Sequence, residues 1–218
     1  MGSRLFLLSP ANCSGRRAQL LLSAHASFDL AARLRDRDAP IGEVFSFVSG
    51  LYFRGKLTYA TAFARIADTP PEDSLAGRGV LIITSSAGLR APETPVTLDA
   101  LRRFAAESVD ASNAAYRAPL VRSAEAVARE IGPDCDVVLL GSIASPKYVD
   151  VLLGVFGQRL LFPSAFVGRG DMSRGGLMLR AAADGRELQY QPVAGAVRHG
   201  PRPPKLEPLR ATLRRSGV

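Results

Sequence analysis

The sequence contains no tryptophan, only two cysteines and only two histidines. Two cysteines cannot build a disulfide scaffold, so we expect a chain that works in a reducing compartment, the cytoplasm. The cysteines and histidines also lack the spacing of metal ligands, so we expect no metal site, and we name no cofactor.

Long apolar runs are absent as well. No stretch approaches the roughly 20 apolar residues that span a bilayer. The run at residues 5–8 is too short for the apolar region of a signal peptide, and no cleavage site follows it. We therefore expect no membrane association, while the oligomeric state is left open by the sequence.

The composition is that of a globular chain, with 218 residues, 47% of them hydrophobic and 22% charged. The formal charge of +8 is concentrated at the end of the chain, because residues 198–218 hold six Lys or Arg against one Glu. A basic tail commonly binds nucleic acid, although it can also be a solubilising terminus. We predict one domain over residues 1–197 and a basic Pro- and Arg-rich tail over residues 198–218, of which residues 201–204 should resist regular structure.

Short apolar runs alternate with helical patterns along the chain. The runs that favour strands are residues 4–8, 80–84, 136–140 and 159–162. The helical patterns are residues 16–22, 28–35, 43–48, 57–66, 97–104, 116–131 and 147–156. Residues 70–73 predict a loop, and residues 177–189, split by Asp184-Gly185, predict a late β-hairpin. The alternation predicts an α/β domain with a central mixed, largely parallel sheet flanked by helices.

Three loops rich in Ser, Gly and Ala follow predicted strands, at residues 9–16, 85–90 and 141–147. In parallel sheets ligands bind beyond the carboxyl ends of the strands, so these loops should converge on one pocket. We predict that this pocket is lined by Ser9, Asn12, Ser86, Ser142, Lys147, Tyr148 and Ser173.

Catalytic candidates in these loops are weak, and whether the chain catalyses a reaction stays open. Asn12 could read a base edge or orient a water, and Lys147 could meet an anionic group. Cys13 lies just before a predicted helix, where a thiolate is favoured, but a nucleophilic cysteine would also need a base.

Arginine-bearing loops lie near both ends of the domain, at residues 9–17 and 168–176, and guanidinium groups suit phosphate or carboxylate oxygens. A glycine-bearing connector, residues 50–56, lies between two apolar helical patterns and suggests a helix-hairpin-helix-like element over residues 43–66. Solvated arginines and aromatic packing under the connector are the alternative interpretation. We predict phosphate or nucleic-acid contacts for Arg16, Arg17, Arg54, Lys56, Arg169 and Arg174.

Four segments, in this order, resemble the YaaA-type peroxide-stress proteins. Ser9-Pro10-Ala11 resembles the family's Ser-Pro-Ala-Lys turn, with Asn12 in place of the lysine. Residues 86–92 echo its Ser-Gly-Leu turn, and residues 144–151 resemble its Ala-Ser-x-x-Tyr-x-x-x-Val segment. Residues 169–174 match its Arg-Gly-x-Met-x-Arg segment. The resemblance implies a single α/β domain that binds DNA and acts in oxidative stress.

Besides an interaction protein whose basic tail docks an acidic partner, two functions follow as hypotheses. The first is a DNA-binding protein of the YaaA type that protects DNA against oxidative stress or damage. The second is an enzyme that acts on a nucleotide or nucleobase, a glycosidase or transferase, because related domains occur beside enzymes of deazaguanine modification. The second would explain why the predicted pocket is so rich in small polar residues.

Overall fold

The computed structural model describes residues 2–66 and 74–206. A six-stranded sheet runs through it in the order β4-β3-β1-β6-β7-β8. The four inner strands are parallel: β3 (Val80–Ile83), β1 (Arg4–Leu8), β6 (Asp136–Leu140) and β7 (Leu160–Pro163). The edge strands β4 (Leu89–Arg90) and β8 (Tyr190–Pro192) pair antiparallel to their neighbours. The prediction of an α/β domain with a mixed, largely parallel sheet is therefore confirmed.

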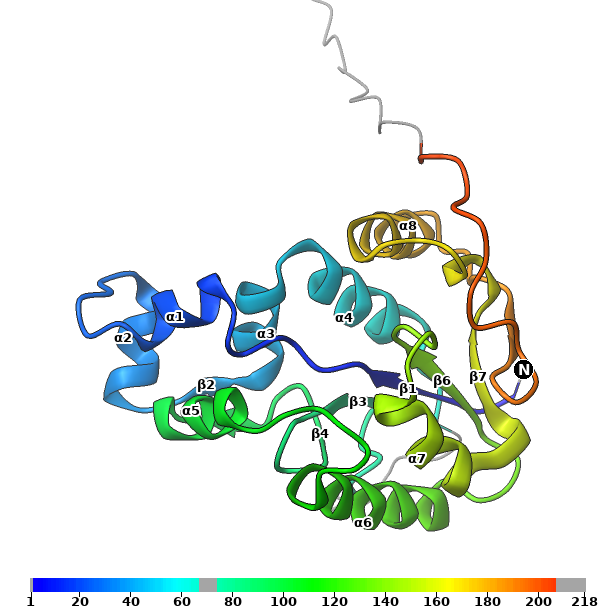
Figure 1. The fold of residues 1–218 in the computed structure, drawn as a ribbon, viewed down its shortest axis with the longest axis horizontal. Helices are drawn as coiled ribbons and strands as arrows, with labels where there is room; N and C mark the ends of the chain where they lie inside the picture. Colours follow the sequence, from blue (N-terminus) through cyan, green and yellow to red (C-terminus); the bar gives the residue numbers. More distant parts are fainter. Residues whose placement is uncertain (1, 67–73, 207–218) are drawn as a thin grey trace, which may run out of the picture.

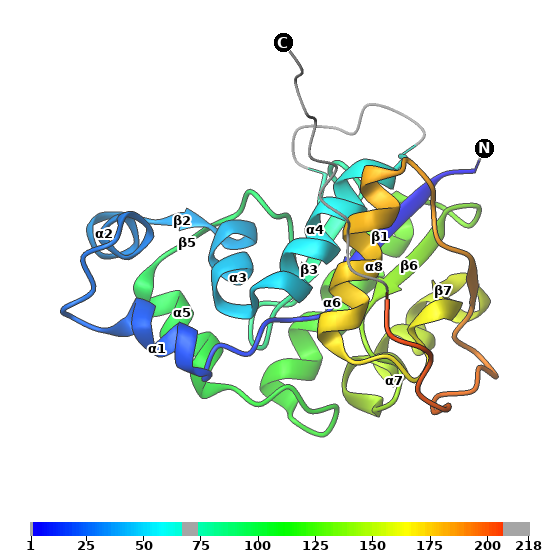
Figure 2. The same ribbon diagram turned by 90° about the horizontal axis from the view of Figure 1, so that it is seen from above.

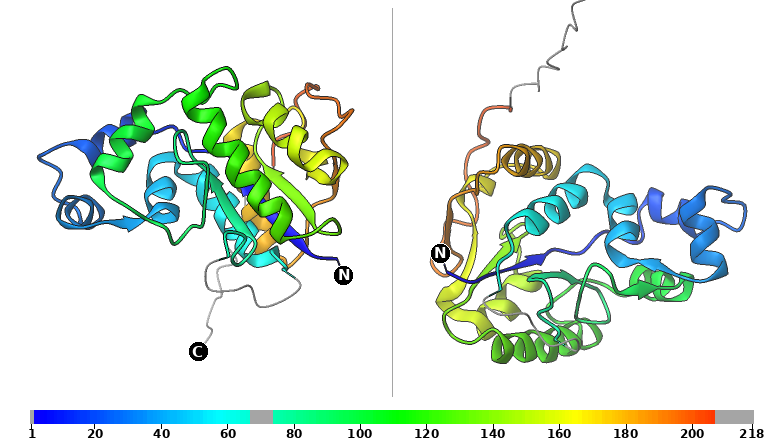
Figure 3. Two further views of the ribbon diagram at one scale, coloured as in Figure 1. Left: turned by 90° about the horizontal axis from the view of Figure 1, so that it is seen from below. Right: turned by 180° about the vertical axis from the view of Figure 1, so that it is seen from behind.

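Helices cover both faces of this sheet (Figure 1). One face carries α4 (Leu51–Phe63) and α8 (Asp171–Ala183), and the other carries α6 (Ala114–Glu130) and α7 (Pro146–Phe156). The remaining helices gather beyond the carboxyl ends of the inner strands, as the view from below also shows (Figure 3). They are α1 (Arg16–Leu22), α2 (Asp29–Asp36), α3 (Ile41–Ser49) and α5 (Leu98–Ala106), and beside them β2 (Ala39–Pro40) pairs with β5 (Pro95–Val96).

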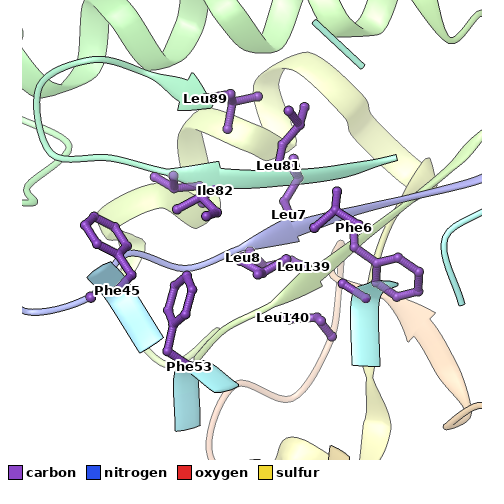
Figure 4. Close-up of a cluster of buried hydrophobic side chains, with 14 of the residues drawn as sticks. Phe6, Leu7, Leu8, Phe45, Phe53, Leu81, Ile82, Leu89, Leu139 and Leu140 are labelled. Atoms are coloured by element: carbon purple, nitrogen blue, oxygen red, sulfur yellow. The ribbon is translucent and has the colours of Figure 1, made fainter. Parts of the chain in front are cut away.

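The core is centred on β1. Leu5, Phe6, Leu7 and Leu8 are all fully buried, because this strand has a neighbour on each side and helices on both faces (Figure 4). The sequence of a strand in this position is a continuous apolar run and does not alternate between apolar and polar residues. That is why the sequence locates β1, β3 and β6 correctly.

Helix α4 begins six residues earlier than predicted. The prediction of a connector at residues 50–56 is wrong, because a single residue, Gly50, separates α3 from α4. Gly50 has φ +59°, a conformation that glycine adopts readily, so the chain reverses without a longer loop. Arg54 and Lys56 are consequently helical residues, and the helix-hairpin-helix-like element is replaced by two directly abutting helices.

The prediction of a late β-hairpin at residues 177–189 is also wrong. Residues 171–183 form α8, and β8 pairs with β7 instead. The buried residues Arg174, Met178 and Ala181 recur with helical spacing, and this pattern outweighs the strand-like run Leu177-Met178-Leu179. Helix α8 lies beside α4 (Figure 2). Gly55 and Gly175 meet there, and a Cβ added to Gly55 would be only 2.7 Å from the Gly175 carbonyl oxygen.

Thr97 caps α5 by accepting from the Ala100 N–H. Residues 201–204 have no regular structure, whereas the loop at 70–73 and the tail from residue 207 lie outside the described residues. None of the helices in the described ranges is long and apolar enough to cross a membrane.

Candidate functional site

A pocket of about 890 Å³ opens at the carboxyl edge of the inner strands. Its walls come from the loop after β1, the segment between α5 and α6, the loop after β6, and the first residues of α4, α7 and α8. Of the predicted pocket residues, the structure brings Ser9, Asn12, Ser142, Lys147 and Tyr148 to this pocket.

Two predicted pocket residues lie elsewhere. Ser86 lines a smaller depression with Arg90 and Arg122, and its neighbour Ser85 faces the main pocket instead. Ser173 is a residue of α8 that accepts a hydrogen bond from Arg169. The error at Ser173 follows from taking residues 168–176 as a loop, because a helix directs successive side chains to different sides.

Lys56 is the most unusual residue beside the pocket. Its side chain is fully buried, and its ammonium donates to the Ser9 carbonyl oxygen at 2.5 Å and to the Ser9 hydroxyl at 2.9 Å. The Tyr52 and Phe53 rings flank Nζ, each with its centroid 4.6 Å away. In the part of the chain that the structure describes, no carboxylate forms an ion pair with Lys56.

Burial therefore dominates the ionisation of Lys56. It lowers the pKa of the amine from 10.5 to about 7, against a smaller opposing effect of the Asp171 charge. Asp171 lies at the start of α8 and lines the pocket. A large fraction of Lys56 is consequently neutral at physiological pH and able to accept a proton.

Ser9 is held firmly against this lysine. Its N–H donates to the Leu140 carbonyl, which anchors the loop after β1 to the end of β6. Gly141 lies so close that an added Cβ would be 2.8 Å from the Ser9 Cβ and 2.9 Å from the Tyr148 hydroxyl. Tyr148 donates to the Ser142 carbonyl, and burial raises its pKa although a hydrogen bond with Ser9 opposes this.

Tyr52 presents a buried hydroxyl to the same pocket. Its oxygen has no partner that meets hydrogen-bond geometry within the described ranges, although Arg174 is close enough to oppose the rise in its pKa caused by burial. Arg174 itself is directed inward, because its guanidinium donates twice to the Phe166 carbonyl and lies 3.6 Å from Asp171.

Cys13 is unsuited to nucleophilic chemistry. It lines the pocket but is only 5% exposed, and burial raises the pKa of its thiol to about 12. The sequence-based argument that a helix start favours a thiolate is outweighed by this desolvation. Cys135, the other cysteine, is also buried.

The predicted phosphate contacts differ in exposure. Arg16, Arg17 and Arg54 are exposed, whereas Arg169 is half-buried and bonded to the carbonyls of Ala165 and Pro204. Lys56 and Arg174 are buried, so their charged groups face the interior rather than the outer surface. The sequence predicts a phosphate-binding cation at Lys56, whereas the apolar residues Leu51-Tyr52-Phe53 just before it in the same helix are the signal that indicates burial.

No cluster of three or more potential metal ligands occurs among the described residues. Comparisons with models of protein families, with curated proteins and with solved structures found no match to this chain.

Proposed function

We propose that this protein is an enzyme that acts on a nucleobase or nucleoside in the Ser9 pocket, with Lys56 as its general base. The observation that carries the proposal is the buried amine of Lys56, 2.9 Å from the Ser9 hydroxyl, beside a pocket at the carboxyl edge of a parallel sheet. General bases function best when their pKa lies near the working pH, and burial brings Lys56 to about 7.

A purely structural role explains Lys56 poorly. Lysine is almost never fully buried unless a charged partner compensates it, because removing an ammonium from water is costly. A leucine or methionine would fill this site between Tyr52 and Phe53 without that cost. Retaining an amine here is reasonable if its ability to exchange a proton is used.

The pocket lining supports a nucleobase-like ligand. Aromatic side chains of Tyr52, Phe104 and Tyr148 offer surfaces for an aromatic ring, and amide and hydroxyl groups such as those of Asn12 and Ser142 offer hydrogen bonds. The charged residues that line the pocket are one lysine, Lys147, and three carboxylates, Glu107, Asp110 and Asp171. An excess of carboxylates disfavours a phosphate-rich ligand in the pocket, so the uncharged part of a nucleotide fits it better.

The proposal is tested by ligand stabilisation and product analysis. Purified protein is mixed with nucleobases, deazapurines, nucleosides and nucleotides, the thermal midpoint is measured, and ligands that raise it are then analysed for conversion by chromatography. We expect conversion to fall about 100-fold or more in Lys56→Met, because a general base contributes roughly that factor. Lys205→Met, the same change at an exposed lysine, should behave like wild type.

If none of these compounds stabilises the protein, or if Lys56→Met converts them at the wild-type rate, the proposed enzyme function is wrong.

A DNA-binding function of the YaaA type, protective in oxidative stress or DNA damage, is the second candidate. It is supported by the exposed arginines Arg16, Arg17 and Arg54. Arg17 donates to the Phe47 carbonyl near the α3–α4 junction, and the Arg54 N–H donates to the Gly50 carbonyl at that same junction. The three side chains thus belong to neighbouring helix starts.

This candidate is tested by measuring duplex and single-stranded DNA affinity over a salt series. Replacing all three arginines with alanine should weaken binding and reduce the salt slope by about one for each arginine. The matched control replaces three exposed arginines of α6, Arg117, Arg122 and Arg129, on the opposite face of the sheet. Equal losses in both triple variants would mean that binding is not located at the α3–α4 junction.

A further inference from the structure

We infer that Ser9 is a nucleophile activated by Lys56, and that the reaction passes through an acyl-serine formed from a carboxylic ester or amide. This inference rests on the proposed function in one respect, the role of Lys56 as a base. It goes beyond that function because it assigns the nucleophile, the covalent intermediate and the bond that is cleaved.

The first support is the geometry of the Ser9–Lys56 pair. A nucleophile and a base within hydrogen-bond distance, with the base oriented by a third group, form the general signature of nucleophilic catalysis. Here Nζ lies 2.9 Å from the Ser9 hydroxyl, and the Ser9 carbonyl accepts a second hydrogen bond from the same nitrogen. With one N–H directed at that carbonyl, the lone pair of the neutral amine is free to accept the hydroxyl proton.

The second support is that Ser9 both lines the pocket and is fixed in place. The Ser9 N–H is bonded to Leu140, and Gly141 leaves just enough room for the serine side chain beside the Tyr148 hydroxyl. A serine with only a packing role would not have to line a pocket. It would also not require a buried amine and a tyrosine hydroxyl close to its own hydroxyl oxygen. Preorganisation of this kind lowers the cost of reaching the reactive geometry.

Stabilisation of the developing oxyanion is available in the same loop. Pro10, directly after Ser9, has no N–H, so the candidate donors are the backbone N–H groups of Ala11 and Asn12. Both residues line the pocket, and these N–H groups make no hydrogen bond within the described part of the chain. Backbone N–H groups next to a nucleophile are the usual donors of an oxyanion hole.

The pocket charge favours an acyl group over a phosphoryl group as the electrophile. Three carboxylates and one lysine line the pocket, and the nearby Arg174 is engaged with the Phe166 carbonyl. A phosphoryl group would bring further negative charge to be neutralised, whereas an ester or amide carbonyl is uncharged until the transition state.

The chemical steps balance without a cofactor. The Ser9 Oγ attacks the carbonyl carbon and its proton moves to Lys56, which gives a tetrahedral oxyanion and an ammonium. The ammonium then protonates the departing alcohol or amine as the C–O or C–N bond breaks, and the acyl group remains on Ser9. Lys56 next takes a proton from a water as its oxygen attacks the acyl carbon. The ammonium returns that proton to the Ser9 Oγ as the ester C–O bond breaks, which releases the carboxylic acid and restores the free serine and the neutral amine.

Titratable groups on three helices lie around the Ser9–Lys56 pair and the adjoining pocket. They are Tyr52 on α4, Tyr148 on α7, and Asp171 and Arg174 on α8. Burial has the largest effect on the Lys56 pKa, and of these groups only the Asp171 charge acts against it. The reactivity of Ser9 should therefore rise through neutral pH as Lys56 loses its proton.

The test is covalent labelling of the full-length protein with a small fluorophosphonate. The Ser9 oxygen would displace fluoride from phosphorus, so an adduct is seen as a mass increase and is located by peptide mapping. We expect one adduct, on Ser9, forming faster as the pH rises with a midpoint near 7. Labelling should be lost in Ser9→Ala and slowed about 100-fold in Lys56→Met. Ser27→Ala, a control on an exposed serine outside the pocket, should label normally.

A second variant guards against misfolding. Ser9→Cys places a thiol beside Lys56, and its alkylation by iodoacetamide should slow when Lys56→Met is added. Each variant is compared with wild type by circular dichroism. An adduct on another residue, no adduct on folded wild type, or equal labelling of wild type and Lys56→Met would overturn the inference.

Failure of the inference is distinguishable from failure of the proposed function. Nucleoside conversion that depends on Lys56 without any Ser9 adduct would leave the base role intact and refute the nucleophile. A Ser9 adduct in a protein that converts no nucleobase compound would support the nucleophile and refute the substrate class.

Discussion

The amine of Lys56 has exchanged water for two aromatic rings and the two oxygens of one serine. Its positive charge is therefore costly in the folded state, and the folded protein releases that proton more readily than the unfolded chain does. The same property that makes Lys56 a usable base should also appear in the pH dependence of stability.

We expect the wild type to gain stability relative to Lys56→Met as the pH rises from 7. The folded-state pKa is about 7 and the unfolded value is 10.5, so between these values the unfolded chain binds more protons and rising pH favours the folded state. The difference in unfolding free energy between the two proteins should change by about 1 kcal/mol per pH unit in urea titrations. A pH-independent difference would show that Lys56 titrates normally.

At Cys13 the effect of burial has the opposite chemical consequence. Its thiol, with a pKa near 12, should react slowly with iodoacetamide at mildly alkaline pH in the native protein, and rapidly once urea unfolds the chain. Peptide mapping separates Cys13 from Cys135, which is also buried. Rapid native labelling of Cys13 would restore it as a candidate nucleophile.

At the scale of elements, the site depends on how closely α4 and α8 approach. Helix α4 carries Tyr52 and Lys56, and α8 carries Asp171 and Arg174. Backbone meets backbone between them, because Gly55 and Gly175 have no side chains to keep the helices apart. Glycine in a helix normally lowers stability, so its presence at both positions indicates that close packing is required.

Gly55→Ala should therefore destabilise the protein, by about 1–3 kcal/mol, because the new methyl group would meet the Gly175 backbone rather than a flexible side chain. It should also shift Lys56 from Ser9. The control is Gly154→Ala in α7, where an added Cβ meets nothing within 4 Å, and this change should be neutral or slightly stabilising. Thermal unfolding of both variants provides the comparison, and equal stabilities would refute the close-packing argument.

At the scale of the whole molecule, the sequence predicts the sheet better than the site. Buried strands such as residues 4–8 and 136–140 are apolar throughout, and small-residue loops follow them, so the position of the pocket is predictable. Lys56 is not, because its burial results from α4 packing against α8 and the loop after β1, which are distant in sequence. The same contacts direct Arg174 inward, although the sequence presents it as a surface arginine.

The sign of the charge differs between the outer surface of the molecule and the pocket. The described fold presents exposed arginines at the α3–α4 junction, while carboxylates predominate among the charged groups that line the pocket. DNA affinity and nucleobase chemistry would therefore use different surfaces. The arginine triple variant is expected to lose DNA affinity without losing ligand stabilisation in the pocket, which thermal-shift measurements on that variant would show.

The most direct test of this account is the titration of Lys56 itself. The chain has three lysines, Lys56, Lys147 and Lys205, so carbon-13 labelling of lysine gives a spectrum in which Lys56→Met assigns the Lys56 resonance by its loss. We expect this resonance to titrate with a midpoint near pH 7. A midpoint near the ordinary lysine value of about 10.4 would mean that the amine is accessible to water and that the Ser9 pocket has no base.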